Sequence, residues 1–258
     1  MASLKNIIIE ELRGVSEIVK PEEVDLSSFV MRNTLNSKIW KSEDKIDPKI
    51  RKQLLKIADD FVEFLDIPWV EVIDVTLTGS LANYNWSEYS DIDLHIIFNF
   101  QDINENEELV KDFLDSKRKI WNDTHNITIY GFEVEIYAQD INEPHTSTGV
   151  YSLEYNKWVI KPNKLKPRFD KILIKKKASE LMTKIDDIIE MYHEGKYERV
   201  VNESEKLWEK IKKMRKAGLE KEGEFSYENI VFKVLRRSGY INKFMKIKDQ
   251  AYDILNSI

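Results

Sequence analysis

The most informative part of this sequence is Leu77-Thr78-Gly79-Ser80, followed one short segment later by Ser90-Asp91-Ile92-Asp93-Leu94-His95. Gly79 ends an apolar run, residues 69–78, that predicts a strand, and Ser80 opens a short predicted helix over residues 80–86. The free N–H groups and the partial positive charge of a helix N-terminus favour phosphate binding. Gly79 and Ser80 therefore form a predicted phosphate-binding turn.

Asp91 and Asp93 lie at the start of the next predicted strand, residues 91–98. Carboxylates two residues apart on a strand point to the same face, here the face opposite Ile92 and Leu94. Mg²⁺ prefers hard oxygen ligands and keeps coordination positions for substrate phosphates. A phosphate-binding turn just before such a pair predicts a protein that handles a nucleoside triphosphate.

A third carboxylate is expected from a neighbouring strand, because two metal ions about 3.5–4 Å apart need shared ligands. The predicted strand over residues 131–137 offers two candidates. Its Val134 and Ile136 are expected to face the core, so Glu133 and Glu135 share the other face. Glu135 is the preferred ligand because apolar residues flank it on both sides, whereas Glu133 is more peripheral.

These motifs resemble the signature of the DNA polymerase β-like nucleotidyltransferase superfamily. Their spacing is most similar to that of its small bacterial members, the minimal and the aminoglycoside nucleotidyltransferases, over about residues 69–138. The resemblance implies that Gly79 and Ser80 hold the triphosphate. It also implies that Asp91, Asp93 and Glu135 are the catalytic residues and the ligands of Mg²⁺ or Mn²⁺.

The same resemblance implies that a nucleoside monophosphate passes from the triphosphate to an acceptor hydroxyl. Ser90 is expected to assist nucleotide binding by orienting the two aspartates. Asn83 and Tyr84 stand where many small relatives have Arg and Gly, so this turn is not expected to supply an arginine contact. Residues 77–95 and 145–151 further resemble nucleotidyltransferase-like proteins of large tailed phages, which predicts a phage-encoded member.

The alternation of strands and helices predicts an α/β (α+β) fold, with a mixed-sheet nucleotidyltransferase core followed by a C-terminal helical bundle. We expect an N-terminal segment over residues 1–45, the catalytic domain over 46–165 and the helical domain over 166–258. Asp47-Pro48 is a typical helix start, and residues 149–160 predict a hairpin. A helix over residues 105–121 is expected to turn the following side chains inward: Leu109, Phe113, Leu114 and Ile120.

The composition is that of a folded globule, with 42% hydrophobic and 33% charged residues. The absence of cysteine excludes a disulfide framework and a thiolate metal site. No apolar stretch approaches the roughly 20 residues of a membrane span, so no membrane partner is predicted and the cytoplasm is the expected location.

The charge is distributed unevenly along the chain. Residues 1–160 hold 16 basic against 30 acidic residues, whereas residues 161–258 hold 24 against 16. The densest basic stretch, Lys161 to Lys177, favours a polyanion-binding surface, although lysines on helix exteriors also serve ordinary solvation. Nucleic acid is therefore a candidate partner.

Three functions are compatible with these features. The first is transfer of a nucleoside monophosphate to a small molecule or protein, and the second is modification of an RNA 3′ end. The third is a catalytically inactive nucleotidyltransferase-like binding or structural module. No base-recognition motif is present, so the nucleotide (ATP among the candidates) and the acceptor stay open.

Overall fold

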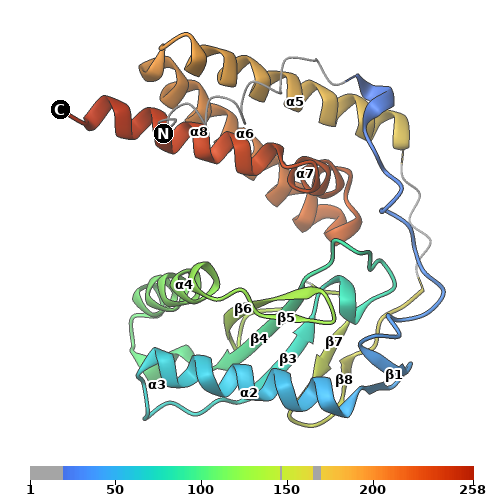
Figure 1. The fold of residues 1–258 in the computed structure, drawn as a ribbon. Coiled ribbons are helices and arrows are strands. Elements are labelled where there is room, and N and C mark those ends of the chain that lie inside the picture. Colours follow the sequence, from blue (N-terminus) through green and yellow to red (C-terminus); the bar gives the residue numbers. More distant parts are fainter. Residues whose placement is uncertain (1–19, 146, 165–169) are drawn as a thin grey trace, which may run out of the picture. The chain divides into compact units, whose positions relative to one another are not determined.

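A computed structural model describes residues 20–145, 147–164 and 170–258 of the chain, which form two compact units (Figure 1). The first lies within Ser28–Lys166, and the second combines residues up to Ser27 with those from Pro167 onward. Residues 28–45 therefore belong with the sheet, whereas from the sequence we set residues 1–45 apart. The reason is apolar burial, because Leu35, Ile39 and Trp40 lie in the core of the sheet unit. The division into domains stays a prediction.

The described residues of the first unit build a six-stranded sheet in the order β5-β6-β4-β3-β7-β8. Strands β4 and β6 pair in parallel, and the other neighbours pair antiparallel. The mixed sheet confirms the predicted fold class. The strands are β3 (Asp74–Thr78), β4 (Ile92–Phe98), β5 (Thr128–Ile129), β6 (Phe132–Asp140), β7 (Val150–Ser152) and β8 (Lys157–Ile160), beside a separate pair, β1 (Trp40–Ser42) and β2 (Lys45–Ile46).

Helix α2 (Pro48–Leu65) begins where the sequence predicts, because the Asp47 carboxylate accepts a hydrogen bond from the backbone N–H of Lys49. One side of the sheet, with Ile92, Leu94 and Ile136, shares a hydrophobic core with α2 and with helix α4 (Glu107–Thr124). A short helix, α3 (Phe100–Ile103), links β4 to α4. The polar alternate residues of β4 and β6 consequently lie on the other face of the sheet.

Helix α4 is rotated relative to our expectation. Val110, Leu114 and Trp121 are buried, whereas Leu109 and Ile120, which we expected to point inward, are 58% and 52% exposed. The ring of Trp121 packs edge-on against Phe61 of α2 at 5.5 Å between centroids. The observed rotation buries the large Trp121 ring in the core together with Val110 and Leu114.

The strand before Gly79 and the helix after it are both shorter than predicted. Strand β3 covers only the last part of the apolar run, and the predicted helix is a single 3-10 turn, η2 (Ser80–Ala82). Asn83 ends η2 in an extended conformation, and its side chain bonds Thr148 and the backbone N–H of Tyr84. These side-chain bonds compete with continuation of the helix.

The second unit is helical, as predicted. Its described elements are η1 (Pro21–Glu23), α5 (Lys171–His193), α6 (Tyr197–Glu222), η3 (Gly223–Phe225), α7 (Tyr227–Arg237) and α8 (Tyr240–Asn256). Ser226 caps α7 by accepting from the N–H of Asn229, as its position in the sequence indicates. Ile185, Phe244 and Ile247 are among its fully buried side chains.

Asp186 on α5 makes the stability of the protein dependent on pH. Burial is the largest cause that raises the pKa of Asp186 to about 6, although Tyr240 donates a hydrogen bond to it. Because the folded-state pKa exceeds the unfolded value, the contribution of this group to stability falls as pH rises from about 4 through 6. Asp186→Asn should therefore raise Tm by about 1–3 °C at pH 7.5, and the gain should shrink toward pH 4.5. Thermal unfolding at both pH values checks this, and a wild type more stable than the variant at pH 7.5 contradicts it.

Candidate active site

Gly79 occupies a position that only glycine fits. Its φ of 71° lies in the left-handed region. A Cβ atom built there would lie 1.7 Å from Oδ2 of Asp93. Thr78, which precedes it, is the register partner of Asp93 across the β3–β4 ladder. The turn and Asp93 are thus in direct contact.

Ser80 and Ser90 join the turn to the start of β4. The Ser80 hydroxyl lies 2.8 Å from Oγ of Ser90, which also accepts a hydrogen bond from the backbone N–H of Ser87. Ser90 is buried. Through these contacts Ser90 links the turn to the start of β4, and its expected role in orienting the aspartates stays a prediction.

The predicted carboxylates come from neighbouring strands. Asp93 and Glu135 are register partners in the parallel pair β4–β6, and both are half-buried. Asp91 lies directly before β4, two residues from Asp93. Glu133 is exposed and is paired with Thr128 of β5. Thr78, Asp93 and Glu135 consequently lie at one level of three adjacent strands, and Gly79 follows directly after Thr78.

The neighbour of Glu135 on its face of the strand is Tyr137, whose hydroxyl donates a 2.5 Å hydrogen bond to Oε2 of Glu135. Burial, followed by the charges of Asp93 and Glu135, raises the pKa of Tyr137. The adjacent His95 is also affected, because burial lowers its pKa to about 4. At neutral pH both rings are therefore uncharged beside the carboxylates.

The three predicted carboxylates have the chemistry of divalent-metal ligands. Asp91, Asp93 and Glu135 offer only carboxylate oxygens, which are the ligands that Mg²⁺ and Mn²⁺ prefer. Within residues 20–145, 147–164 and 170–258, no three His, Asp or Glu side chains converge into a ready-made metal site. Metal ligation by these three residues stays a prediction.

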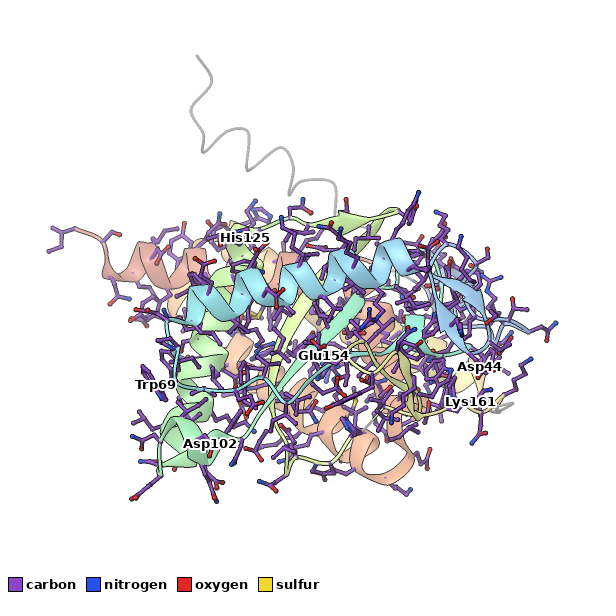
Figure 2. All side chains as sticks on the ribbon, turned by 90° about the horizontal axis from the view of Figure 1, so that it is seen from below. Asp44, Trp69, Asp102, His125, Glu154 and Lys161 are labelled. Atoms are coloured by element: carbon purple, nitrogen blue, oxygen red, sulfur yellow. The ribbon has the colours of Figure 1, made fainter. Side chains whose placement is uncertain are left out.

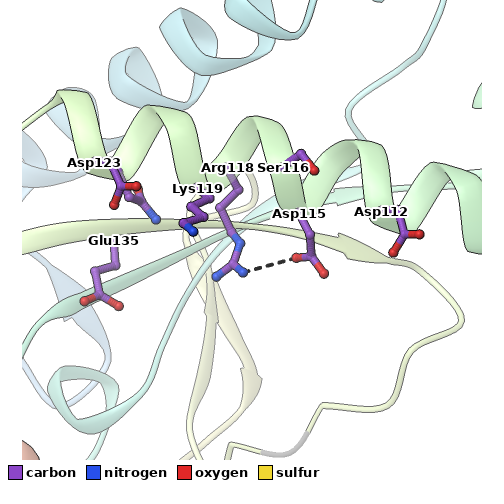
Figure 3. A pocket seen from close by; sticks show the side chains of 8 residues that line it. Asp112, Asp115, Ser116, Arg118, Lys119, Asp123 and Glu135 are labelled. Carbon is purple, nitrogen blue, oxygen red and sulfur yellow. Dashed lines mark ion pairs between the residues drawn. The ribbon is translucent and has the colours of Figure 1, made fainter. Parts of the chain in front are cut away.

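Helix α4 and Glu135 line a polar hollow of about 600 Å³ (Figure 3). Arg118 points from α4 into it and forms an ion pair with Asp115 at 3.2 Å. Asn122 bonds both backbone groups of Ile136, so α4 borders the edge of β6. The sequence offered no signal for this hollow, because alternating charges on a helix are typical of a solvated face.

Ser147, Thr148 and Gly149 reach the Gly79 turn from a distant part of the chain. The N–H of Gly79 donates to Oγ of Ser147 at 3.3 Å, and Asn83 bonds Thr148. A Cβ atom on Gly149 would lie 2.1 Å from the carbonyl oxygen of Ala82. Ser147 and Thr148 were not predicted as site residues. Exposed His145 lies 3.5 Å from Gln139, which in turn bonds His95.

Part of the basic stretch 161–177 is occupied by ion pairs. Lys161 pairs with Asp44 at 2.5 Å, and Figure 2 labels the two residues close to each other. Lys164 lies 4.0 Å from Glu43, and Lys177 pairs with Glu180. Lys166 and Arg168 lie outside the described residues. Nucleic-acid binding through this stretch stays a prediction.

A mixed sheet that brings a glycine turn and carboxylates together is the arrangement expected of a nucleotidyltransferase core. Residues 52–209 match the family model described as "Nucleotidyltransferase domain", and the chain belongs to this family. No curated protein matches the chain significantly. Phage origin is not addressed by these comparisons and stays a prediction.

One similar solved structure is a STING-associated CdnE c-di-GMP synthase from Capnocytophaga granulosa. It is 16% identical, with a TM-score of 0.20, over 82% of this chain and 85% of that chain. A similarity this low carries no argument about function. Separately, no helix in the described part of the chain is long and apolar enough to cross a membrane.

Gly79→Ala should lower transfer at low nucleotide concentration by about a hundredfold, because the new methyl group displaces Asp93 and the turn from their positions. The matched control is Gly195→Ala, since Gly195 also has a positive φ, of 78°, but no atom lies within 4 Å of the added Cβ. Steady-state kinetics and nucleotide titration calorimetry would measure both variants. Unchanged triphosphate binding in Gly79→Ala would show that the Gly79 turn does not bind the triphosphate.

Proposed function

We propose that this protein is a metal-dependent nucleotidyltransferase that moves a nucleoside monophosphate from a nucleoside triphosphate to an acceptor hydroxyl on a small molecule, protein or RNA. The observation that carries the proposal is the juxtaposition of the Gly79 turn, directly after β3, with Asp93 on β4 and of Asp93 with Glu135 on β6. Membership of the nucleotidyltransferase family supports the reaction class.

In this proposal the Gly79–Ser80 turn holds the triphosphate through its backbone N–H groups and the Ser80 hydroxyl. The phosphate oxygens would replace Ser147 and Ser90, which accept hydrogen bonds from these groups in the free protein. Asp91, Asp93 and Glu135 would hold Mg²⁺ or Mn²⁺, which supplies charge neutralisation for the phosphates and lowers the pKa of the acceptor hydroxyl. The acceptor oxygen forms a bond to the α-phosphorus while the bond to pyrophosphate breaks. Glu135 would take the hydroxyl proton.

The test is incubation of the full chain with each α-labelled nucleoside triphosphate, Mg²⁺ or Mn²⁺, and candidate acceptors. Labelled acceptor and equimolar pyrophosphate are the expected products. An RNA acceptor should lose affinity steeply with salt because counterions compete for its phosphates, whereas a small acceptor should not. Nucleotide binding without pyrophosphate release under every condition would instead identify an inactive binding module.

A further inference from the structure

Tyr137 is the side chain that restrains Glu135. The two residues are neighbours on one face of β6, because they are two positions apart on a strand. The phenol donates to Oε2 of Glu135 at 2.5 Å. No hydrogen bond to Oε1 of Glu135 is found among the described residues, so one carboxylate oxygen is held and the other is available.

The Tyr137 ring is itself held by two neighbours. On β4, its register partner His95 stacks on it with centroids 4.9 Å apart and an interplanar angle of 24°. From α4, the Arg118 guanidinium lies 5.0 Å from the ring centroid, a distance typical of a cation–π contact. Since β4 and α4 border opposite edges of β6, the ring is restrained from both sides.

Both neighbours are fixed in turn. Nδ1 of His95 faces Oε1 of Gln139 at 2.8 Å, and Arg118 pairs with Asp115 at 3.2 Å. A glutamate side chain has several rotatable bonds whose ordering costs free energy. A network that orders Glu135 before substrate arrives would remove that cost from the reaction.

We propose that Tyr137 is a positioning residue that holds Oε2 of Glu135 and thereby presents Oε1 to the metal and the acceptor proton. This inference rests on the proposed function. Tyr137 has a role distinct from that of the three carboxylates, because it acts only through Glu135. Groups that orient a metal-binding carboxylate typically contribute 10- to 100-fold to metal affinity or activity.

The test compares Tyr137→Phe with Tyr151→Phe, which removes the same hydroxyl from a buried tyrosine of the same sheet. The Tyr151 hydroxyl donates to Asn156, and its ring packs against Trp40 and Trp158. Tyr137→Phe should lower kcat by about 10- to 30-fold, with KM for the nucleotide within about twofold. Mn²⁺ affinity, measured by electron paramagnetic resonance with a non-hydrolysable triphosphate analogue, should weaken at least about fivefold. Tyr151→Phe should match the wild type in all three measurements.

A second pair of variants separates positioning from general damage. In a Glu135→Gln background, adding Tyr137→Phe should change Mn²⁺ affinity by less than about twofold, because coupled residues are not additive. The inference about Tyr137 is overturned, and the proposed function is left standing, by either of two results. One is a Tyr137→Phe variant with wild-type kcat and Mn²⁺ affinity. The other is a loss of Mn²⁺ affinity on adding Tyr137→Phe that is as large in the Glu135→Gln background as in the wild type. A wild-type protein that neither transfers nucleotide nor binds Mn²⁺ overturns the proposed function, and this inference with it.

Discussion

Asp93→Asn is expected to lower nucleotidyl transfer by at least about a thousandfold, because a bound metal supplies several kcal/mol of transition-state stabilisation. Asp93 is the residue that contacts the Gly79 turn and pairs in register with Glu135. The same substitution removes the negative charge that lies opposite Glu135 in the β4–β6 register. In metal-free buffer the Tm should therefore be unchanged or raised.

Asp74→Asn is the matched control, because Asp74 is a half-buried carboxylate at the opposite end of β3, where it bonds Ser152. Its activity should stay close to that of the wild type. Steady-state assays and thermal unfolding with a chelator present distinguish the two variants. A marked loss of Tm in chelated Asp93→Asn would show that Asp91 and Asp93 are structural and would count against the site.

Glu135→Gln is expected to cost about a thousandfold in turnover, whereas Glu133→Gln should cost about tenfold or less, because only one of these carboxylates is a predicted metal ligand. The two glutamates share a strand and a face and differ in their neighbours. Glu135 is half-buried opposite Asp93, while Glu133 is exposed opposite Thr128. A carboxylate in the less hydrated position benefits more from a bound cation.

The comparison should be made under saturating nucleotide and acceptor, with Mn²⁺ affinity measured in parallel. Loss of both turnover and Mn²⁺ affinity in Glu135→Gln is the expected pattern. The reverse ranking of the two variants would place the metal beside Glu133. It would show that Glu135 has a structural role in the sheet and no role in catalysis. Equal, small losses would remove the third carboxylate from the mechanism.

The residue pattern by itself determined the elements that depend on local chemistry. The alternation of Ile92, Leu94, Val134 and Ile136 predicted which side chains of two strands are buried, because successive strand residues point to opposite faces. Asp47-Pro48 predicted a helix start, since the Asp47 carboxylate satisfies an N–H group only two residues away. These interactions are complete within a few residues of the chain.

The tertiary structure alone decided which of these elements meet. The parallel register of Asp93 with Glu135, the approach of Ser147 to Gly79 and the placement of Arg118 beside Tyr137 join residues far apart in sequence. In α4 the packing of Trp121 against Phe61 of another helix accompanies the burial of Val110 and Leu114, whereas Leu109 and Ile120 stay exposed. Such contacts form only when separate segments pack together, because the free energy that selects them comes from shared burial and not from local propensity.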